Sequence, residues 1–183
     1  YISTYIDSSY ISGNVSGRFT LDNSPYFVTN NIVLQPDDTL TIDPGVKIEF
    51  LGNYRFDVFG KLIAIGEDSN LIYFSGDNDT QWMSINFADA SDDNSIIEYA
   101  VIENASESGY EPYFGAINCN QSNPTIRNNI IQNCDNDGIH LYYSNALLSN
   151  NFLENIGGHG IYSDQYGQPV IISNEIRNVA WSA

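Results

Sequence analysis

The segment Ile126-Arg127-Asn128-Asn129-Ile130-Ile131-Gln132-Asn133 decides the fold, because versions of it return later in the chain. The later copies are Leu148-Ser149-Asn150-Asn151-Phe152-Leu153-Glu154-Asn155 and Ile172-Ser173-Asn174-Glu175-Ile176-Arg177-Asn178. Their first residues follow at intervals of 22 and 24 residues, and a fainter copy at residues 97–104 begins 29 residues before the first. A repeat of this length indicates a solenoid, in which each coil stacks on the one before it.

The aliphatic residues of the repeat fall into three columns, provided that the last copy carries a two-residue insertion within residues 163–168. Equivalent residues of successive coils lie about 4.8 Å apart and stack as ladders inside the solenoid. The columns are Ile85, Ile117, Ile139 and Ile161; then Ile97, Ile126, Leu148 and Ile172; then Ile102, Ile131, Leu153 and Ile176. Three apolar faces predict three strands per coil and a triangular cross-section.

Asparagine forms two further columns at the expected corners of the coil. One column holds Asn128, Asn150 and Asn174, and the other holds Asn104, Asn133, Asn155 and Asn178. Asparagine tolerates the left-handed backbone of a tight corner, and its amide can bond both the turn and the asparagine of the next coil. We therefore interpret these residues as structural asparagine ladders rather than as ligand contacts.

The amino-terminal half reads as a series of short strands. Runs such as Val46-Lys47-Ile48-Glu49-Phe50 and Lys61-Leu62-Ile63-Ala64-Ile65 are rich in β-branched and aromatic residues, mostly alternate, and end at Gly, Asp, Asn or Pro. No window shows helical periodicity, which argues against a leucine-rich repeat with its convex helices. An antiparallel sandwich is the competing all-β interpretation, but it does not explain the repeat.

These motifs resemble the right-handed parallel β-helix proteins of the pectate-lyase-like superfamily. The resemblance rests on the asparagine repeats together with Asp137-Gly138-Ile139-His140-Leu141 and His159-Gly160-Ile161-Tyr162. The amino-terminal half is similar to the lead-in of secreted modular bacterial proteins of this type, at Asp43-Pro44-Gly45-Val46-Lys47 and Gly60-Lys61-Leu62-Ile63. The resemblance implies an all-β, right-handed parallel β-helix, secreted or displayed on a cell surface.

We expect a single β-helix domain over residues 1–183. Residues 1–31 are predicted to be an amino-terminal cap or edge segment, and residues 32–183 to be the coils. Residues 179–183 read as the start of a further coil without an amphipathic cap to follow, so the carboxy-terminal end is predicted to be uncapped.

Composition sets limits on the partners. The chain has 23 acidic and 6 basic residues among 183, a formal net charge of −17, which repels nucleic acid and anionic membrane surfaces. No apolar run approaches the roughly 18 to 20 residues that a membrane span needs, so membrane insertion is not expected. Two cysteines, Cys119 and Cys134, are too few to predict a disulfide framework.

A catalytic constellation is not visible in the expected outward columns. Enzymes of the resembled family place paired carboxylates, or a lysine or arginine base, on one sheet face, and glycosidases need two carboxyl groups about 5 to 10 Å apart. The two outward columns read Asn86, Asn118, His140 and Tyr162, and Ala88, Asn120, Tyr142 and Asp164. They hold one carboxylate and one histidine, so we predict no catalytic residues, although the excursions at residues 89–94 and 105–113 remain an alternative location.

A metal site is not predicted either. His159 falls in the column of Asp137, whereas His140 points out of the sheet, so the two histidines are not expected to face one ligand. The run Asp135-Asn136-Asp137-Gly138 offers oxygens for calcium together with Asp164 or Glu154, but it lacks the full spacing of a calcium loop. Calcium remains an alternative, and no other cofactor is expected.

Two functions remain open. The first is an extracellular structural or adhesive module that associates end to end with further copies or with other chains of the same surface assembly. The second is a carbohydrate-active protein that binds or cleaves an extracellular polysaccharide, because tyrosine, histidine and asparagine together suit stacking on sugar rings and bonding of hydroxyl groups. The predicted glycan-binding residues are Asn86, Asn118, His140, Tyr142, Tyr162 and Asp164.

Overall fold

The computed structural model describes residues 9–76, 81–89, 91–106, 114–164 and 166–181. Within these residues the chain forms strands joined by short turns, and one 3-10 helix, η1 (Leu21–Asn23). The strands are β1 (Ser9–Asn14), β2 (Gly17–Phe19), β3 (Tyr26–Leu34), β4 (Thr39–Ile42), β5 (Lys47–Phe50), β6 (Phe56–Val58), β7 (Lys61–Ile65), β8 (Ile72–Gly76), β9 (Ile85–Phe87), β10 (Ile96–Glu98), β11 (Ala100–Glu103), β12 (Gly115–Asn120), β13 (Thr125–Arg127), β14 (Ile130–Cys134), β15 (Asp137–Tyr142), β16 (Leu147–Ser149), β17 (Phe152–Ile156), β18 (Ile161–Asp164), β19 (Val170–Ile172) and β20 (Glu175–Val179).

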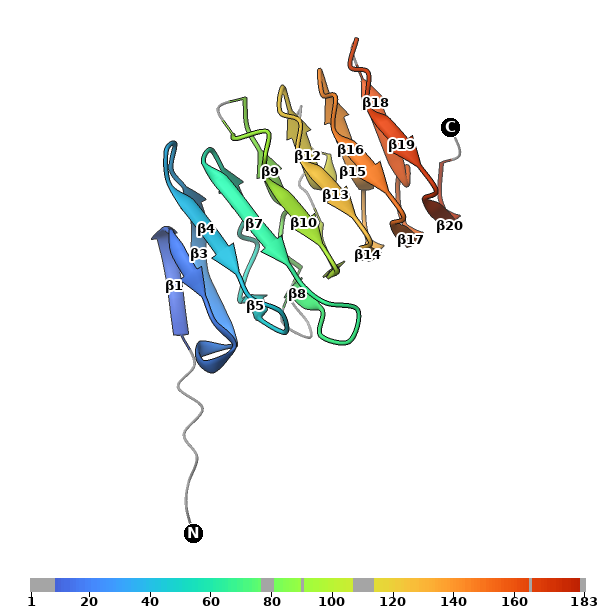
Figure 1. Ribbon diagram of the computed structural model, residues 1–183. Helices are drawn as coiled ribbons and strands as arrows, with labels where there is room; N and C mark the ends of the chain where they lie inside the picture. Colours follow the sequence, from blue (N-terminus) through green and yellow to red (C-terminus); the bar gives the residue numbers. More distant parts are fainter. Residues whose placement is uncertain (1–8, 77–80, 90, 107–113, 165, 182–183) are drawn as a thin grey trace.

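The strands stack in parallel along one axis, from β1 at one end to β20 at the other (Figure 1). A seven-stranded sheet has the order β19-β16-β13-β10-β7-β4-β2, so each strand pairs with its equivalent in the next coil. The other sheet has thirteen strands, in the order β18-β15-β12-β9-β6-β3-β5-β8-β11-β14-β17-β20, with β1 paired to β3 off this path. Every pairing between these strands is parallel, as a β-helix requires.

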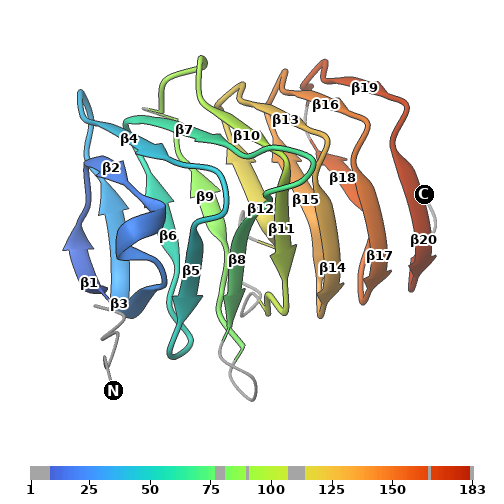
Figure 2. The ribbon, with the colours of Figure 1, turned by 60° about the horizontal axis from the view of Figure 1, so that its bottom comes forward.

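The thirteen-stranded sheet has two arms that meet at β3. The first part of this long strand pairs with β5, at Tyr26 and Ile48, and its last part pairs with β6, at Ile32 and Phe56. Figure 2 shows the two arms and the seven-stranded sheet as the walls of the solenoid. The hydrogen bonds thus make two main sheets rather than three separate ones, because β3 belongs to both arms.

Two of the predicted ladders are confirmed by the strand register, and one contains an error. Ile85, Ile117, Ile139 and Ile161 are partners in successive coils, and so are Ile102, Ile131, Leu153 and Ile176. In the remaining column Leu148 pairs with Ile171, and Ile172 pairs with Ser149. The insertion before β19 is therefore one residue rather than two, and three successive aliphatic residues, 170–172, hid the difference in the sequence.

One of the two asparagine columns shifts for the same reason. Asn174 does not continue the column of Asn128 and Asn150; Ser173 takes that place, with a left-handed φ of 55° beside 57° and 54°. Asn174 instead continues a buried ladder with Asn129 and Asn151. The second predicted column is confirmed, since all four of its residues have left-handed backbones: Asn104, Asn133, Asn155 and Asn178.

The buried ladder bonds each coil to the next through the asparagine amides. Asn151 Nδ2 donates to the Ile126 carbonyl oxygen at 2.9 Å and to Asn174 Oδ1 at 2.9 Å. Asn151 Oδ1 accepts hydrogen bonds from the backbone N–H and the amide of Asn129, both at 3.1 Å. These bonds satisfy backbone groups that the corner leaves without a strand partner.

The core is one continuous column of aliphatic and aromatic side chains. Trp82 is fully buried and stacks on Phe50, with ring centroids 4.3 Å apart. Cys119 and Cys134 are buried free thiols, and burial raises the pKa of both, that of Cys134 to about 12. No helix in the described ranges has the length and apolar character to cross a membrane.

The two ends of the solenoid differ. Of the predicted cap or edge segment, the described residues 9–31 hold β1, β2, η1 and the start of β3, with β1 and β2 at sheet edges. At the other end β19 leaves Val170, Ile171 and Ile172 about half exposed, at 47%, 47% and 53%. Residues 1–8 and 182–183 lie outside the described residues.

Candidate functional site

A hollow opens on the outer face of the arm that contains β12, β15 and β18, toward the carboxy-terminal end of the solenoid. Its volume is about 410 Å³. The side chains around it come from β15 and β18, from the segments before β12, β15 and β18, and from the segment after β20. The lining residues are Phe114, Asn136, Asp137, His140, Tyr142, Gly157, Gly158, His159, Tyr162, Asp164 and Trp181.

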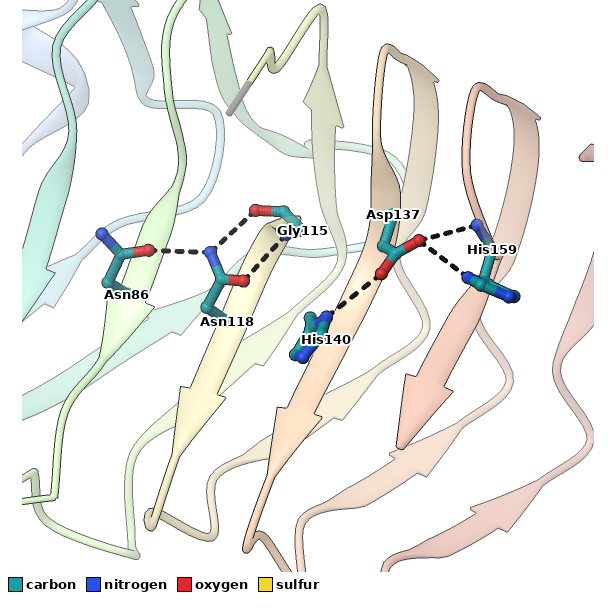
Figure 3. A network of polar contacts seen from close by, with 6 residues as sticks. All are labelled: Asn86, Gly115, Asn118, Asp137, His140 and His159. Carbon is teal, nitrogen blue, oxygen red and sulfur yellow. Dashed lines mark hydrogen bonds and ion pairs between the residues drawn. The ribbon is translucent and has the colours of Figure 1, made fainter. Parts of the chain in front are cut away.

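A single carboxylate, that of Asp137, lies between two imidazoles (Figure 3), and all three groups line the hollow. Asp137 Oδ2 lies 3.1 Å from His140 Nδ1, and Asp137 Oδ1 lies 3.1 Å from His159 Nδ1. The backbone N–H of His159 also donates to Oδ1 at 2.7 Å. Asp137 and His140 are nearly buried, whereas His159 is partly exposed.

The parallel register brings these three residues together. Asp137 starts β15, His140 follows three residues later on the same strand, and His159 lies in the next coil before β18. Gly158 makes room for the contact, because a Cβ there would overlap Asp137 Oδ1. Gly115 in the coil below does the same for the backbone of His140, which a Cβ would approach to 2.9 Å.

The carboxylate of Asp137 remains ionised. Burial raises its pKa, but the hydrogen bonds that His140 and His159 donate outweigh burial, and the pKa is lowered overall. An ionised carboxylate only accepts hydrogen bonds, so each Nδ1 carries the hydrogen. In a neutral imidazole Nε2 is then an acceptor, and it lies on the side of each ring away from Asp137 (Figure 3).

Aromatic rings run across the hollow from coil to coil. The centroid of Phe114 lies 5.6 Å from His140, and His140 lies 5.0 Å from Tyr162. Tyr162 lies 4.8 Å from His159, which contacts Trp181 at 5.3 Å. Together the five rings form a run parallel to the solenoid axis, and Trp181 is 62% exposed at its end.

Four of the six residues predicted from the sequence line this hollow: His140, Tyr142, Tyr162 and Asp164. The other two, Asn86 and Asn118, lie in earlier coils and are buried away from it. Asn118 Nδ2 donates to Asn86 Oδ1 and to the Gly115 carbonyl oxygen, both at 2.8 Å, and its Oδ1 accepts from the Gly115 N–H at 2.8 Å (Figure 3). We therefore assign Asn86 and Asn118 to the support of the strands and leave them out of the candidate site.

The sequence pattern missed Phe114, Asp137, His159 and Trp181. The expectation that His140 and His159 do not face one ligand is wrong, because both rings line the same hollow and share Asp137. The sequence does contain an indication of this contact, because the repeat aligns His159 with Asp137 in neighbouring coils. The alternation of inward and outward residues along a strand does not by itself show that a carboxylate at the start of the strand contacts two imidazole rings.

The carboxylates of residues 135–138, considered above as calcium ligands, are hydrogen-bonded to protein groups. Asp137 accepts hydrogen bonds from the two histidines, and Asp135 accepts one from Gln81 Nε2 at 2.5 Å. Within the part of the chain that the structure describes, no three His, Cys, Asp or Glu side chains are grouped to hold a metal ion. The excursion at residues 105–113 lies mostly outside the described residues, and in the other excursion Asp92 caps a turn by accepting from Asn94.

The arrangement suits binding better than hydrolysis. Asp137 and Asp164 both line the hollow, but Asp137 is engaged by three donors and its pKa is lowered, which disfavours the role of a proton donor. The hollow offers ring faces, imidazole acceptors and a second carboxylate. These are groups that pack against a sugar ring and accept hydrogen bonds from its hydroxyls.

Comparison with known proteins finds one partial relative and one family. Protein bark beetle of Drosophila melanogaster is 43% identical over 47 residues, which are 26% of this chain and 2% of that protein. The chain thus spans only a small part of this relative's length, and no solved structure gives a significant match. The family model described as "Right handed beta helix region" matches residues 62–183, more than half of the chain. The chain therefore belongs to the right-handed β-helix family, with the fold of the pectate-lyase-like superfamily.

Proposed function

We propose that this chain is an extracellular β-helix module that binds a glycan in the hollow around Asp137. The observation that carries the proposal is the run of rings from Phe114 to Trp181 beside imidazole and carboxylate acceptors. Sugars present apolar faces and hydroxyl donors together, and a site that offers both ring faces and acceptors complements them. The acidic composition fits a secreted or surface-displayed protein.

The rigid position of the binding groups supports the proposal. Asp137 fixes the orientation of His140 and His159, and Gly158 and Gly115 let the backbone approach closely. A site whose groups are held before the ligand arrives loses less entropy on binding. The acceptors and rings therefore need little rearrangement to take a ligand.

Calorimetric titration of oligosaccharides against the wild type and two variants tests the proposal. Trp181→Ala removes the exposed end of the ring run, and we expect its affinity to fall about fivefold, because a stacked aromatic ring contributes roughly 1 kcal/mol. Tyr10→Ala is the matched control, since Tyr10 is 68% exposed and belongs to β1, at the opposite end of the solenoid. Equal affinities for the two variants, or no binding of any glycan by the wild type, would contradict the proposal.

A structural or adhesive role is the second candidate function. It is favoured by the exposed aliphatic side chains of β19, Val170, Ile171 and Ile172, which a further coil would cover. We count three strands per coil for this purpose, for example β12, β13 and β14, because the two arms of the larger sheet and the smaller sheet each supply one.

Light scattering over a wide concentration range tests this second candidate, with a further copy of the chain as the partner. A mass that grows with concentration, and that falls when Ile171 is replaced by Lys, supports end-to-end association. A constant monomer mass contradicts self-association of this chain.

A further inference from the structure

The electrostatic character of the hollow restricts the kind of glycan it accepts. Its lining includes the carboxylates of Asp137 and Asp164. All six Lys and Arg residues of the chain lie in the described ranges, and none of them lines the hollow. Arg177, on β20, is bonded to Glu175 and lies over the ring of Phe152. A negatively charged ligand would therefore meet like charges in a lining that contains no Lys or Arg.

The hydrogen-bonding polarity of the hollow points the same way. Because the Nδ1–H groups of His140 and His159 donate hydrogen bonds to Asp137, the imidazoles present Nε2 as acceptors when neutral. Asp164 adds a carboxylate that also accepts only. Sugar hydroxyls donate to such groups, whereas a carboxylate or sulfate has no hydrogen to donate and is left desolvated against them.

The direction of the rings indicates the shape of the ligand. Phe114 precedes β12, His140 lies on β15, Tyr162 lies on β18 and Trp181 follows β20, so the run crosses successive coils. Neighbouring coils are about 4.8 Å apart, and a ligand that contacts this run extends along the solenoid axis over several coils. A chain of linked sugars has this extended form, and a single sugar does not.

We infer that the ligand of the hollow is an uncharged oligosaccharide chain that lies along the solenoid axis and donates hydroxyl hydrogens to His140, His159 and Asp164. The inference rests on the proposed function and specifies its substrate class. It excludes acidic polysaccharides as ligands of the hollow. Asp164 acts in it as a specificity-determining residue that rejects anionic sugars.

A panel of oligosaccharides matched in length tests the inference by calorimetry at pH 7.5. The neutral members are hexasaccharides of glucose, mannose and xylose, and the anionic members are hexasaccharides of galacturonate and mannuronate. We expect at least one neutral hexasaccharide to bind at least about tenfold more tightly than any anionic one, because each like charge at close range costs roughly 1 kcal/mol or more. We expect shorter neutral chains to bind more weakly than the hexasaccharide.

The variant Asp164→Asn sharpens the test, since it removes a charge while keeping the shape. We expect the ratio between neutral and anionic affinity to fall about threefold or more, with Ser163→Ala as the exposed control on the same strand. Tighter binding of galacturonate or mannuronate by the wild type contradicts this inference but leaves glycan binding intact. Binding of no hexasaccharide contradicts the proposed function and this inference together.

Discussion

Single residues set the geometry of the hollow, and Asp137 is the most important of them. Its carboxylate accepts from His140 and His159 and is itself nearly buried. A carboxylate with several donors orients each of them, so the imidazoles cannot rotate freely. The acceptor character of the hollow therefore depends on this one side chain.

Replacing Asp137 with Asn is expected to lower the free energy of unfolding by about 1 to 3 kcal/mol at pH 7, because the new amide N–H faces histidine donors. The folded pKa of Asp137 is lowered, so its contribution is complete above its ordinary pKa of about 3.9 and is lost as the pH falls through the folded value. Urea titrations of both proteins between pH 7 and pH 2 measure this. A difference in stability that stays constant down to pH 2 contradicts the assignment.

The variant Gly158→Ala tests the close approach of the backbone to Asp137. The added Cβ overlaps Asp137 Oδ1, so the carboxylate or the turn must move, at an expected cost of about 1 to 3 kcal/mol. Thermal unfolding gives the stability, and Ser163→Ala, at an exposed residue of β18, is the control. A melting temperature equal to that of the control means that the turn does not restrain Asp137.

At the scale of the elements, the corners hold the strands in register. The buried ladder of Asn129, Asn151 and Asn174 joins three coils, and the ladder of Asn133, Asn155 and Asn178 lies at an exposed corner. The buried amides bond backbone groups as well as each other, while the side chain of Asn155 is hydrogen-bonded to Asn133 and Asn178. The two ladders should therefore differ in their contribution to stability.

We expect Asn151→Ala to cost about 2 to 4 kcal/mol, because the Ile126 carbonyl oxygen and the buried backbone N–H of Asn129 lose their bonds to the Asn151 side chain. Asn155→Ala should cost about 1 kcal/mol, mainly from the left-handed backbone at that corner. Denaturant unfolding of both variants measures the difference. Equal losses would show that the buried ladder has no special role.

The sequence predicted the strands and most of the register because the repeat has a nearly constant period. It failed at β19, where Val170, Ile171 and Ile172 fit the column equally well, and only the corner geometry selects Ile171. The sequence also predicted the outward residues His140, Tyr142, Tyr162 and Asp164, because side chains alternate between inward and outward along each strand once the register is known. The contact between Asp137 and His159 was not predicted, because it forms where the strands begin. The alternation of inward and outward side chains does not determine contacts there.

At the scale of the whole molecule, the solenoid is a line of coils in which each coil contacts only its neighbours. Stability in such a structure is roughly a sum of terms for coils and their interfaces, so regions with less burial open more easily. The strands β19 and β20 are largely exposed, whereas Ile126 on β13 and Ile131 on β14 are fully buried. We expect the amides of β19 and β20 to exchange with deuterium faster than those of β13 and β14. Uniform exchange would contradict the model of independent coils.

The most direct test of glycan binding in the hollow uses the two tryptophans of the chain. Trp181 lines the hollow, whereas Trp82 is fully buried in the core. Indole N–H signals of ¹⁵N-labelled protein are followed by NMR during titration with the neutral hexasaccharide that binds most tightly. The Trp181 signal should shift in a saturable way while the Trp82 signal stays fixed. A fixed Trp181 signal at saturating sugar would show that the hollow is not the binding site.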